Sequence, residues 1–242
     1  MNDAGSVAWR RSGLGGDVPE VLPLPPSRRL ATFRSADGSQ ESIVAASFVR
    51  GVYALAIPSL RVERLGAADE DWLDLAATTD RRAALGVSSQ TGAVWRLRHA
   101  PGGAAQGGVE RLQIAARPNI RHVAAASADA PVYVADAREA WGLSGVAGIE
   151  AAQLAVSGGD ICDLAVSADG RALIIGQVDG QATVARLAAA ARPTIIATLR
   201  LQRERVANVL AGAPGSLEGP NAVWLGSWDG TLQRIALGPL NP

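Results

Sequence analysis

The residues best suited to metal binding or nucleophilic chemistry are two histidines and a single cysteine, His99, His122 and Cys162. A metal site on one strand or helix usually places a second ligand two to four residues from a histidine. Neither histidine has such a neighbour. Cys162 lies in the apolar strand pattern ICDLAV, where we expect a buried, inert thiol. The sequence therefore predicts structural or surface histidines, no metal site and no cofactor.

Acidic residues gather at one place in the chain, at Asp69, Glu70, Asp71 and Asp74. Such a group could bind Ca²⁺, but it lacks the ligand spacing of a calcium-binding loop. We interpret it as a polar turn before Trp72. The sequence contains no GxSxG elbow, Walker loop or HExxH pair. We therefore predict no catalytic residues and no enzymatic activity.

The composition is that of a folded domain without a strong electrostatic partner. Of the 242 residues 48% are hydrophobic, the net charge is +0, and all 23 basic residues are arginine. No run of five basic residues indicates a nucleic-acid surface, and no apolar stretch reaches the ~18 residues of a membrane helix. The first residues lack the apolar core of a signal peptide. We expect a cytoplasmic or nuclear protein that is not secreted and binds no nucleic acid.

One pattern recurs five times along the chain. An apolar run is followed by a tight turn, and after the turn two apolar positions lie three residues apart. The segments are IVAASFVRGVYAL (43–55), ALGVSSQTGAVWRL (84–97), VYVADAREAWGL (132–143), LIIGQVDGQATVARL (173–187) and VWLGSWDGTLQRI (223–235). Their turns align at Gly51, Gly92, Glu139, Gly180 and Gly230, at intervals of 41, 47, 41 and 50 residues. Four strands in each interval fit the blade of a β-propeller. The predicted fold is all-β, a small β-propeller of about five four-stranded blades.

Further strand candidates lie on both sides of each hairpin. Those before it, which we expect to be outer strands, are 72–80, 120–129, 161–170 and 205–215. Those after it, expected to be fourth strands, are 60–65, 109–115, 149–156 and 194–201. Asp-Gly is the dipeptide of tight hairpins because glycine accepts a positive φ. Asp179-Gly180 and Asp229-Gly230 are therefore predicted to form two-residue turns.

The segment DICDLAVSADGRALIIGQVDGQATVARL (160–187) resembles one WD-repeat unit over most of its length. The likeness lies in an apolar strand, Ser-Ala-Asp-Gly (167–170), a second apolar strand and Asp179-Gly180. Residues 222–235 resemble the second half of such a unit. The resemblance implies a WD-repeat-like propeller. The Gly-His pair and the Trp-Asp end of the third strand are missing, so the side-chain network of regular WD repeats is not carried over to any residue.

Closure of the ring defines the expected domains. Residues 28–242 form the predicted propeller, and little chain remains after Gly230 for a last outer strand. Residues 1–27 are a separate N-terminal segment in which 18–24 could supply that strand, because an open propeller exposes unpaired edges. The alternative is a propeller completed by a partner chain.

A propeller presents loops on a rigid scaffold, and such loops carry function. The turn residues at equivalent repeat positions are Arg50, Gln90, Arg138, Asp179 and Asp229. Trp228 lies beside the last of them, and exposed tryptophan is enriched at binding hot spots. We therefore predict that these six residues contact a protein partner and that the chain is a non-catalytic scaffold within a larger assembly. The alternative is an enzyme or small-ligand receptor with a site in the central channel. Propeller hydrolases and lactonases collect acidic, Asn and His side chains there, and the scarcity of His and Asn argues against them.

Overall fold

The computed structural model describes residues 8–9, 20–21, 24, 27–47, 51–57, 59, 61–67, 69–99, 109–116, 118–144, 149–156, 158–188, 191–200, 206–211, 222–227 and 229–237. All regular elements in these ranges are β-strands. No helix within the same ranges has the length and hydropathy needed to cross a membrane.

Five antiparallel sheets, here called blades 1 to 5, follow one another along the chain. Blade 1 contains β3 (Ser27–Arg34), β4 (Glu41–Ser47), β5 (Val52–Ile57) and β6 (Arg61–Leu65). Blade 2 contains β7 (Trp72–Ala77), β8 (Ala84–Ser88), β9 (Ala93–His99) and β10 (Val109–Ala116). Blade 3 contains β11 (His122–Ala124), β12 (Val132–Ala135), β13 (Glu139–Ser144) and β14 (Ile149–Ala155). Blade 4 contains β15 (Ile161–Val166), β16 (Ala172–Gln177), β17 (Gln181–Ala188) and β18 (Ala191–Arg200). Blade 5 contains β19 (Val206–Ala211), β20 (Ala222–Ser227) and β21 (Leu232–Ala236).

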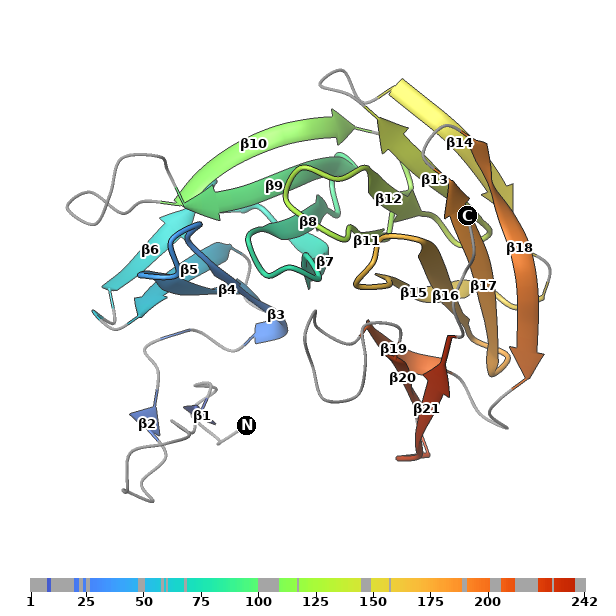
Figure 1. The fold of residues 1–242 in the computed structure, drawn as a ribbon. Helices are drawn as coiled ribbons and strands as arrows, with labels where there is room; N and C mark the ends of the chain where they lie inside the picture. Colours follow the sequence, from blue (N-terminus) through green and yellow to red (C-terminus); the bar gives the residue numbers. More distant parts are fainter. Residues whose placement is uncertain are drawn as a thin grey trace.

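The blades are arranged around a common centre, with each first strand innermost (Figure 1). Strand β3 contacts β7, β7 contacts β11, β11 contacts β15, and β15 contacts β19. The fourth strands, such as β10, β14 and β18, lie on the outside. Four blades have four strands, and the described part of blade 5 has three. The structure is a small all-β propeller, as the repeat pattern predicts.

The sequence predicts the central hairpins and fourth strands correctly but places the first strands on the wrong side. All five repeat segments form the second and third strands of a blade. Segments 72–80, 120–129, 161–170 and 205–215 contain the innermost strands β7, β11, β15 and β19, and not outer ones. Every residue of β15 is buried, because this strand packs between two blades and along the axis.

The core consists of apolar layers between neighbouring blades. Between blades 2 and 3 the layer contains Leu85, Val123 and the buried Trp141. Cys162 is buried in the layer between blades 4 and 5, which confirms the predicted burial of its thiol. Many layer residues are alanine, so the sheets approach closely. These layers pack each described blade against the next.

The two Asp-Gly turns have the predicted backbone conformation but a different length. Gly180 and Gly230 have φ of 81° and 84°. Three residues, 178–180, separate β16 from β17, and four separate β20 from β21. The N–H of Gly180 donates to the carbonyl of Gln177 over 3.2 Å, and that of Gly230 donates to the carbonyl of Ser227 over 3.1 Å. The loop 178–180 matches a three-residue hairpin with glycine at the left-handed position. The prediction of two-residue turns is therefore wrong.

Among the described residues before β3, only Leu24 belongs to a core cluster of blade 1. Glu20–Val21 (β2) pair with Ala8–Trp9 (β1) in a small separate sheet. Leu24 is buried against Ile43 and Leu55 of blade 1. Within the described residues, strand β21 pairs only with β20. Closure of blade 5 by residues 18–24 stays a prediction.

Candidate functional site

The innermost strands carry polar residues at one equivalent position. Each precedes a branched apolar residue, in the pairs Arg29-Leu30, Asp74-Leu75, His122-Val123, Asp163-Leu164 and Asn208-Val209. In four of the five strands the register shifts immediately before this position. Such an irregularity bends a strand and turns a side chain out of the regular alternation. The bulged strands thus bring polar side chains toward the propeller axis.

Asp74 joins blades 1, 2 and 3 at the axis. Its Oδ1 accepts a hydrogen bond from the N–H of Leu75 at 2.9 Å, and its Oδ2 accepts one from Val123 of blade 3 at 3.1 Å. Arg29 Nε of blade 1 lies 3.6 Å from Asp74 Oδ1. Burial by itself raises the pKa of Asp74, but the neighbouring His122 and Arg29 charges and the hydrogen bonds outweigh it. The net result is a lowered pKa, so this carboxyl stays ionised.

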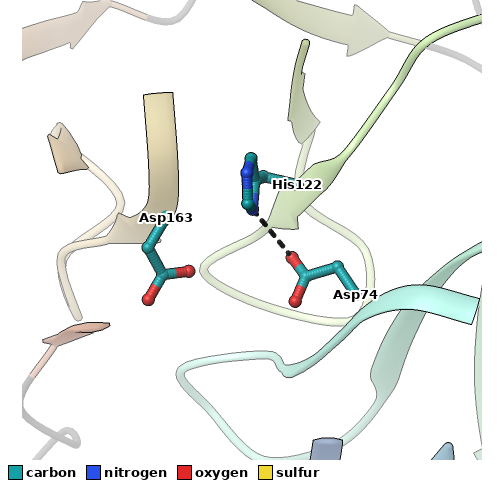
Figure 2. Close-up of side chains that lie close together, drawn as sticks. All are labelled: Asp74, His122 and Asp163. Atoms are coloured by element: carbon teal, nitrogen blue, oxygen red, sulfur yellow. Dashed lines mark ion pairs between the residues drawn. The ribbon is translucent and has the colours of Figure 1, made fainter. Parts of the chain in front are cut away.

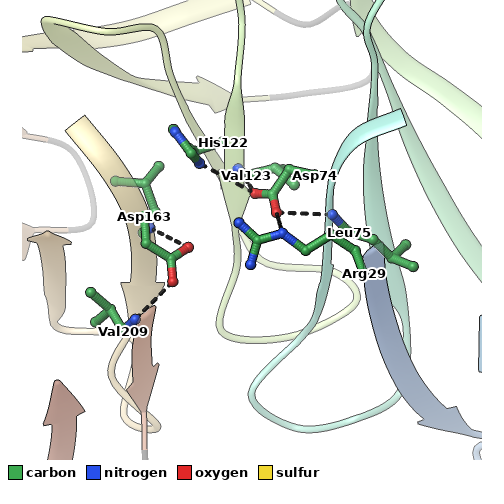
Figure 3. Close-up of polar contacts among 8 residues, drawn as sticks. Arg29, Asp74, Leu75, His122, Val123, Asp163 and Val209 are labelled. Carbon is green, nitrogen blue, oxygen red and sulfur yellow. Dashed lines mark hydrogen bonds and ion pairs between the residues drawn. The ribbon is translucent and has the colours of Figure 1, made fainter. Parts of the chain in front are cut away.

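Asp163 has the same role between blades 4 and 5, as Figure 3 shows. Its Oδ1 accepts from the N–H of Leu164 at 3.0 Å, and its Oδ2 accepts from Val209 at 2.7 Å. No ion pair joins Asp163 to another described residue within 4.0 Å. Burial and the negative charge of Asp74 raise the pKa of Asp163 to about 6. Of the two carboxyls, Asp163 is therefore the one that takes up a proton more readily.

His122 lies between the two carboxylates (Figure 2). Its Nδ1 is 3.8 Å from Asp74 Oδ2, which is an ion-pair distance and too long for a hydrogen bond. This nitrogen is buried and has no hydrogen-bond partner. One ligand atom each from Asp74, His122 and Asp163 lie within 4.8 Å of one another. Three blades therefore contribute to one compact cluster of possible metal ligands.

A cavity of about 550 Å³ follows the axis beside this cluster. All five innermost strands line it, including Arg29, Asp74, Ala124, Asp163 and Val209. Both apolar and polar residues line the cavity. The channel can therefore hold a small polar ligand or a hydrated cation near the carboxylates.

A second depression, here called the groove, crosses the end of blades 2, 3 and 4 and has a volume of about 790 Å³. It is lined by Leu73, Ser89, Gln90, Thr91, Gly92, Pro118, Asn119, Ile120, Arg121, His122, Asp160, Ile161 and Val178. Leu73 is 38% exposed although it lies in the innermost strand β7. Asn119 has φ of 69°, a left-handed conformation that asparagine tolerates better than most residues. His122 belongs both to the groove and to the channel cluster.

The comparison with solved structures now identifies the architecture. The crystal structure of the C-terminal WD40 domain of Sif2 matches with a TM-score of 0.57, over 90% of this chain and 72% of that chain. The two sequences are 13% identical. The chain has the fold of a WD40-like β-propeller. No family model and no curated protein matches the sequence.

Four of the six predicted partner-binding residues of this WD40-like propeller, Gln90, Arg138, Asp179 and Asp229, lie in described turns between the second and third strands. Gln90 is exposed and lines the groove, and its Nε2 donates to the Asp69 carbonyl at 3.0 Å. Arg138 is exposed and forms an ion pair with Asp160 at 2.9 Å. Arg50 and Trp228 lie outside the described residues. The structure thus brings one predicted residue, Gln90, into the groove.

The carboxylates of Asp179 and Asp229 accept hydrogen bonds in their own turns, and that of Asp179 also accepts one from the loop before β15. Asp229 Oδ1 accepts from the N–H and hydroxyl of Thr231 at 2.9 and 2.7 Å. Asp179 Oδ2 accepts from the N–H of Gly159 at 3.1 Å, and its Oδ1 accepts from the N–H of Gln181 at 3.2 Å. These bonds stabilise the hairpins. A binding role for either aspartate stays a prediction.

The acidic group near residue 70 separates into different environments. Glu70 is buried and forms a bidentate ion pair with Arg111, while Trp72 Nε1 donates to its Oε1 at 2.9 Å. Asp74 lies in the channel instead. A shared calcium site is therefore not formed by these two residues. Glu70 has a definite structural partner, which the interpretation as a polar turn misses.

The sequence prediction also misses the Asp74–His122–Asp163 cluster. It searches for ligands close to His122 in the chain, whereas the two aspartates come from neighbouring blades. The scarcity of His and Asn, which argues against propeller hydrolases and lactonases, does not prevent one histidine from joining two aspartates here. The missed signal is the shared position of these residues in the repeat.

Proposed function

We propose that the chain is a non-catalytic protein-interaction scaffold of the cytoplasm or nucleus, a subunit of a larger assembly that binds its partner in the groove. The observation that carries this proposal is a groove of about 790 Å³ that three rigidly packed blades line together. Loops held by a rigid scaffold are the usual place for binding residues. The WD40-like fold is compatible with this role but does not establish it.

The groove combines an apolar patch with a polar border. Leu73 is partly exposed, and Ile161 and Val178 also line the groove. Gln90 and Arg121 are exposed at its border. Protein interfaces have this composition, with apolar anchors at the centre and polar groups around them.

The charges of the border favour a particular kind of partner. Arg121 forms no ion pair with the described residues, whereas Asp160 is already paired with Arg138. The unpaired charge is thus positive. We propose that the partner is a protein segment with an apolar side chain for the Leu73 patch and an acidic residue for Arg121. The predicted turn residues Arg50, Arg138, Asp179, Trp228 and Asp229 would extend this surface to the other blades.

The proposal is tested by affinity capture from the native host with three forms of the protein. Wild type is compared with Leu73→Asp, which places a charge in the groove, and with Leu112→Asp. Leu112 is a matched control because it is 44% exposed on the outermost strand β10. We expect mass spectrometry to find proteins that wild type and the control retain and that Leu73→Asp loses.

The captured partner is then purified and its affinity measured directly. Arg121→Glu should weaken binding by at least about tenfold, because an attractive pair becomes a repulsive one. Circular dichroism confirms that each variant is folded. The proposal is wrong if no protein is captured reproducibly, or if Leu73→Asp and the control retain the same proteins with the same affinity.

A further inference from the structure

We propose that the channel binds a divalent transition-metal cation, with Zn²⁺ as the reference ion, between Asp74, His122 and Asp163. One imidazole and two carboxylates are ligand types that Zn²⁺ accepts, and Mn²⁺ accepts the same set. The three residues come from blades 2, 3 and 4 and their ligand atoms converge (Figure 2), with Asp74 and Asp163 lining the channel and His122 beside it. This inference does not rest on the proposed binding of a partner in the groove.

The distances are close to those of a metal site. Ligand atoms about 2.1 Å from a tetrahedral cation lie about 3.4 Å apart. Asp74 Oδ2 and His122 Nδ1 are 3.8 Å apart, which exceeds this distance by about 0.4 Å. The full set lies within 4.8 Å, so binding requires the ligand atoms to approach by up to about 1.4 Å. Rotations of the Asp163 and His122 side chains would supply this movement.

The hydrogen bonds of the carboxylates leave room for a metal. Each Asp163 and Asp74 oxygen accepts one backbone N–H, and a carboxylate oxygen has two lone pairs. The donors Val123 and Val209 hold the two carboxylates in place, which is the role of outer-sphere partners in metal sites. The channel of about 550 Å³ has space for water molecules that would complete the coordination.

The charge balance favours a cation. Two buried carboxylates face the cluster, and one guanidinium, that of Arg29, lies beside Asp74 Oδ1. Asp163 has no ion-pair partner among the described residues. Buried charges without a partner are unfavourable, and a cation between the carboxylates removes this imbalance.

The environment of His122 is an independent indication of a cation site. Its Nδ1 is buried next to the carboxylates and has no hydrogen-bond partner in the part of the chain that the structure describes. A buried polar atom in this state calls for an explanation, such as an ion that the atom binds. His99 serves as the matched control. It is also half-buried and lacks hydrogen bonds at both nitrogens, but it packs on Phe33 and belongs to no ligand group among the described residues.

The test uses the full chain after removal of metal with EDTA and dialysis. Zinc chloride is titrated by calorimetry, and cobalt chloride is titrated while visible absorption is recorded. We expect one equivalent of Zn²⁺ to bind and Co²⁺ to develop d–d bands. Since a ligand that binds only the native state stabilises it, Zn²⁺ should also raise the unfolding midpoint.

The variants decide where the ion binds. His122→Gln should weaken Zn²⁺ binding by at least about 100-fold, more than the loss of an outer-sphere partner. His99→Gln should bind as wild type does. If His122→Gln does not fold, Asp163→Asn replaces it, with native mass spectrometry as the readout. Absence of Zn²⁺, Co²⁺ and Mn²⁺ binding to wild type overturns the proposal, and so does unchanged binding in the folded variants.

Discussion

The ion pair between Glu70 and Arg111 is expected to be a principal link between the β6–β7 loop and blade 2. Arg111 Nη1 donates to Glu70 Oε2 at 2.7 Å, and Nη2 donates to Oε1. The guanidinium also stacks 3.5 Å from the centre of the Trp95 ring and 5.5 Å from that of Trp72. The exposed fractions of the two charged side chains are 18% for Arg111 and 11% for Glu70. Arg111→Leu would therefore leave a largely buried carboxylate without its cation.

The expected magnitude follows from this burial. Removing one partner of a fully buried pair costs about 3–5 kcal/mol, and a cation–π contact adds about 0.5–2 kcal/mol. Because Arg111 retains some exposure, we expect a loss of about 3 kcal/mol in the free energy of unfolding. Urea unfolding followed by tryptophan fluorescence measures it.

Arg98→Leu is the matched control in the same blade. Arg98 Nε lies 2.8 Å from Glu110 Oε2, but these side chains are 43% and 40% exposed. Surface pairs contribute about 0–1 kcal/mol, so this variant should remain close to wild type. The double variant Glu70→Gln, Arg111→Leu should be more stable than Arg111→Leu, because it removes the buried charge. Equal losses for Arg98→Leu and Arg111→Leu would refute the reasoning.

Three further outcomes are expected. Gly230→Val should lower the free energy of unfolding by about 1–3 kcal/mol, because φ is 84° while the space around the residue is open; an unchanged urea midpoint would contradict this. Leu24→Ala should lower the free energy of unfolding by about 2 kcal/mol or more, because Leu24 is only 3% exposed and packs on blade 1. An unchanged thermal unfolding midpoint would contradict this. The raised pKa of Asp163, about 6 against 3.8, means that the native state holds this proton more tightly than the unfolded state. With EDTA present, the stabilisation from this proton should be complete below about pH 4 and lost as pH rises through 6. In urea titrations, the free energy of unfolding of wild type should therefore rise relative to that of Asp163→Asn between pH 7 and 4.5. Parallel pH dependences of the two proteins would exclude the effect.

The hairpins are predictable from the sequence because their causes are local. Glycine at residues 51, 92, 180 and 230 has a positive φ in the structure, as the turn pattern requires. Apolar β-formers on both sides produce the second and third strands. Loop length is less predictable, because the length of the loop between β20 and β21 depends on the register of these two strands. That register is selected by packing between the blades.

The position of a strand within its blade is not a local property. Strands β7 and β15 carry apolar residues on both faces, as any strand between two packed layers does. Whether such a strand lies at the axis or outside depends on how neighbouring blades meet. The sequence pattern therefore predicts that a strand exists but assigns it to the wrong edge.

The Asp74–His122–Asp163 cluster likewise depends on how the blades meet and not on local sequence. Repeat arithmetic places Asp74, His122 and Asp163 at equivalent positions, one blade apart in the chain. Their meeting within 4.8 Å arises because the first strands converge at the axis and their bulges turn polar side chains inward. Local spacing rules examine a few neighbouring residues, so they find no ligands around His122. The curvature of the whole propeller brings these ligands together.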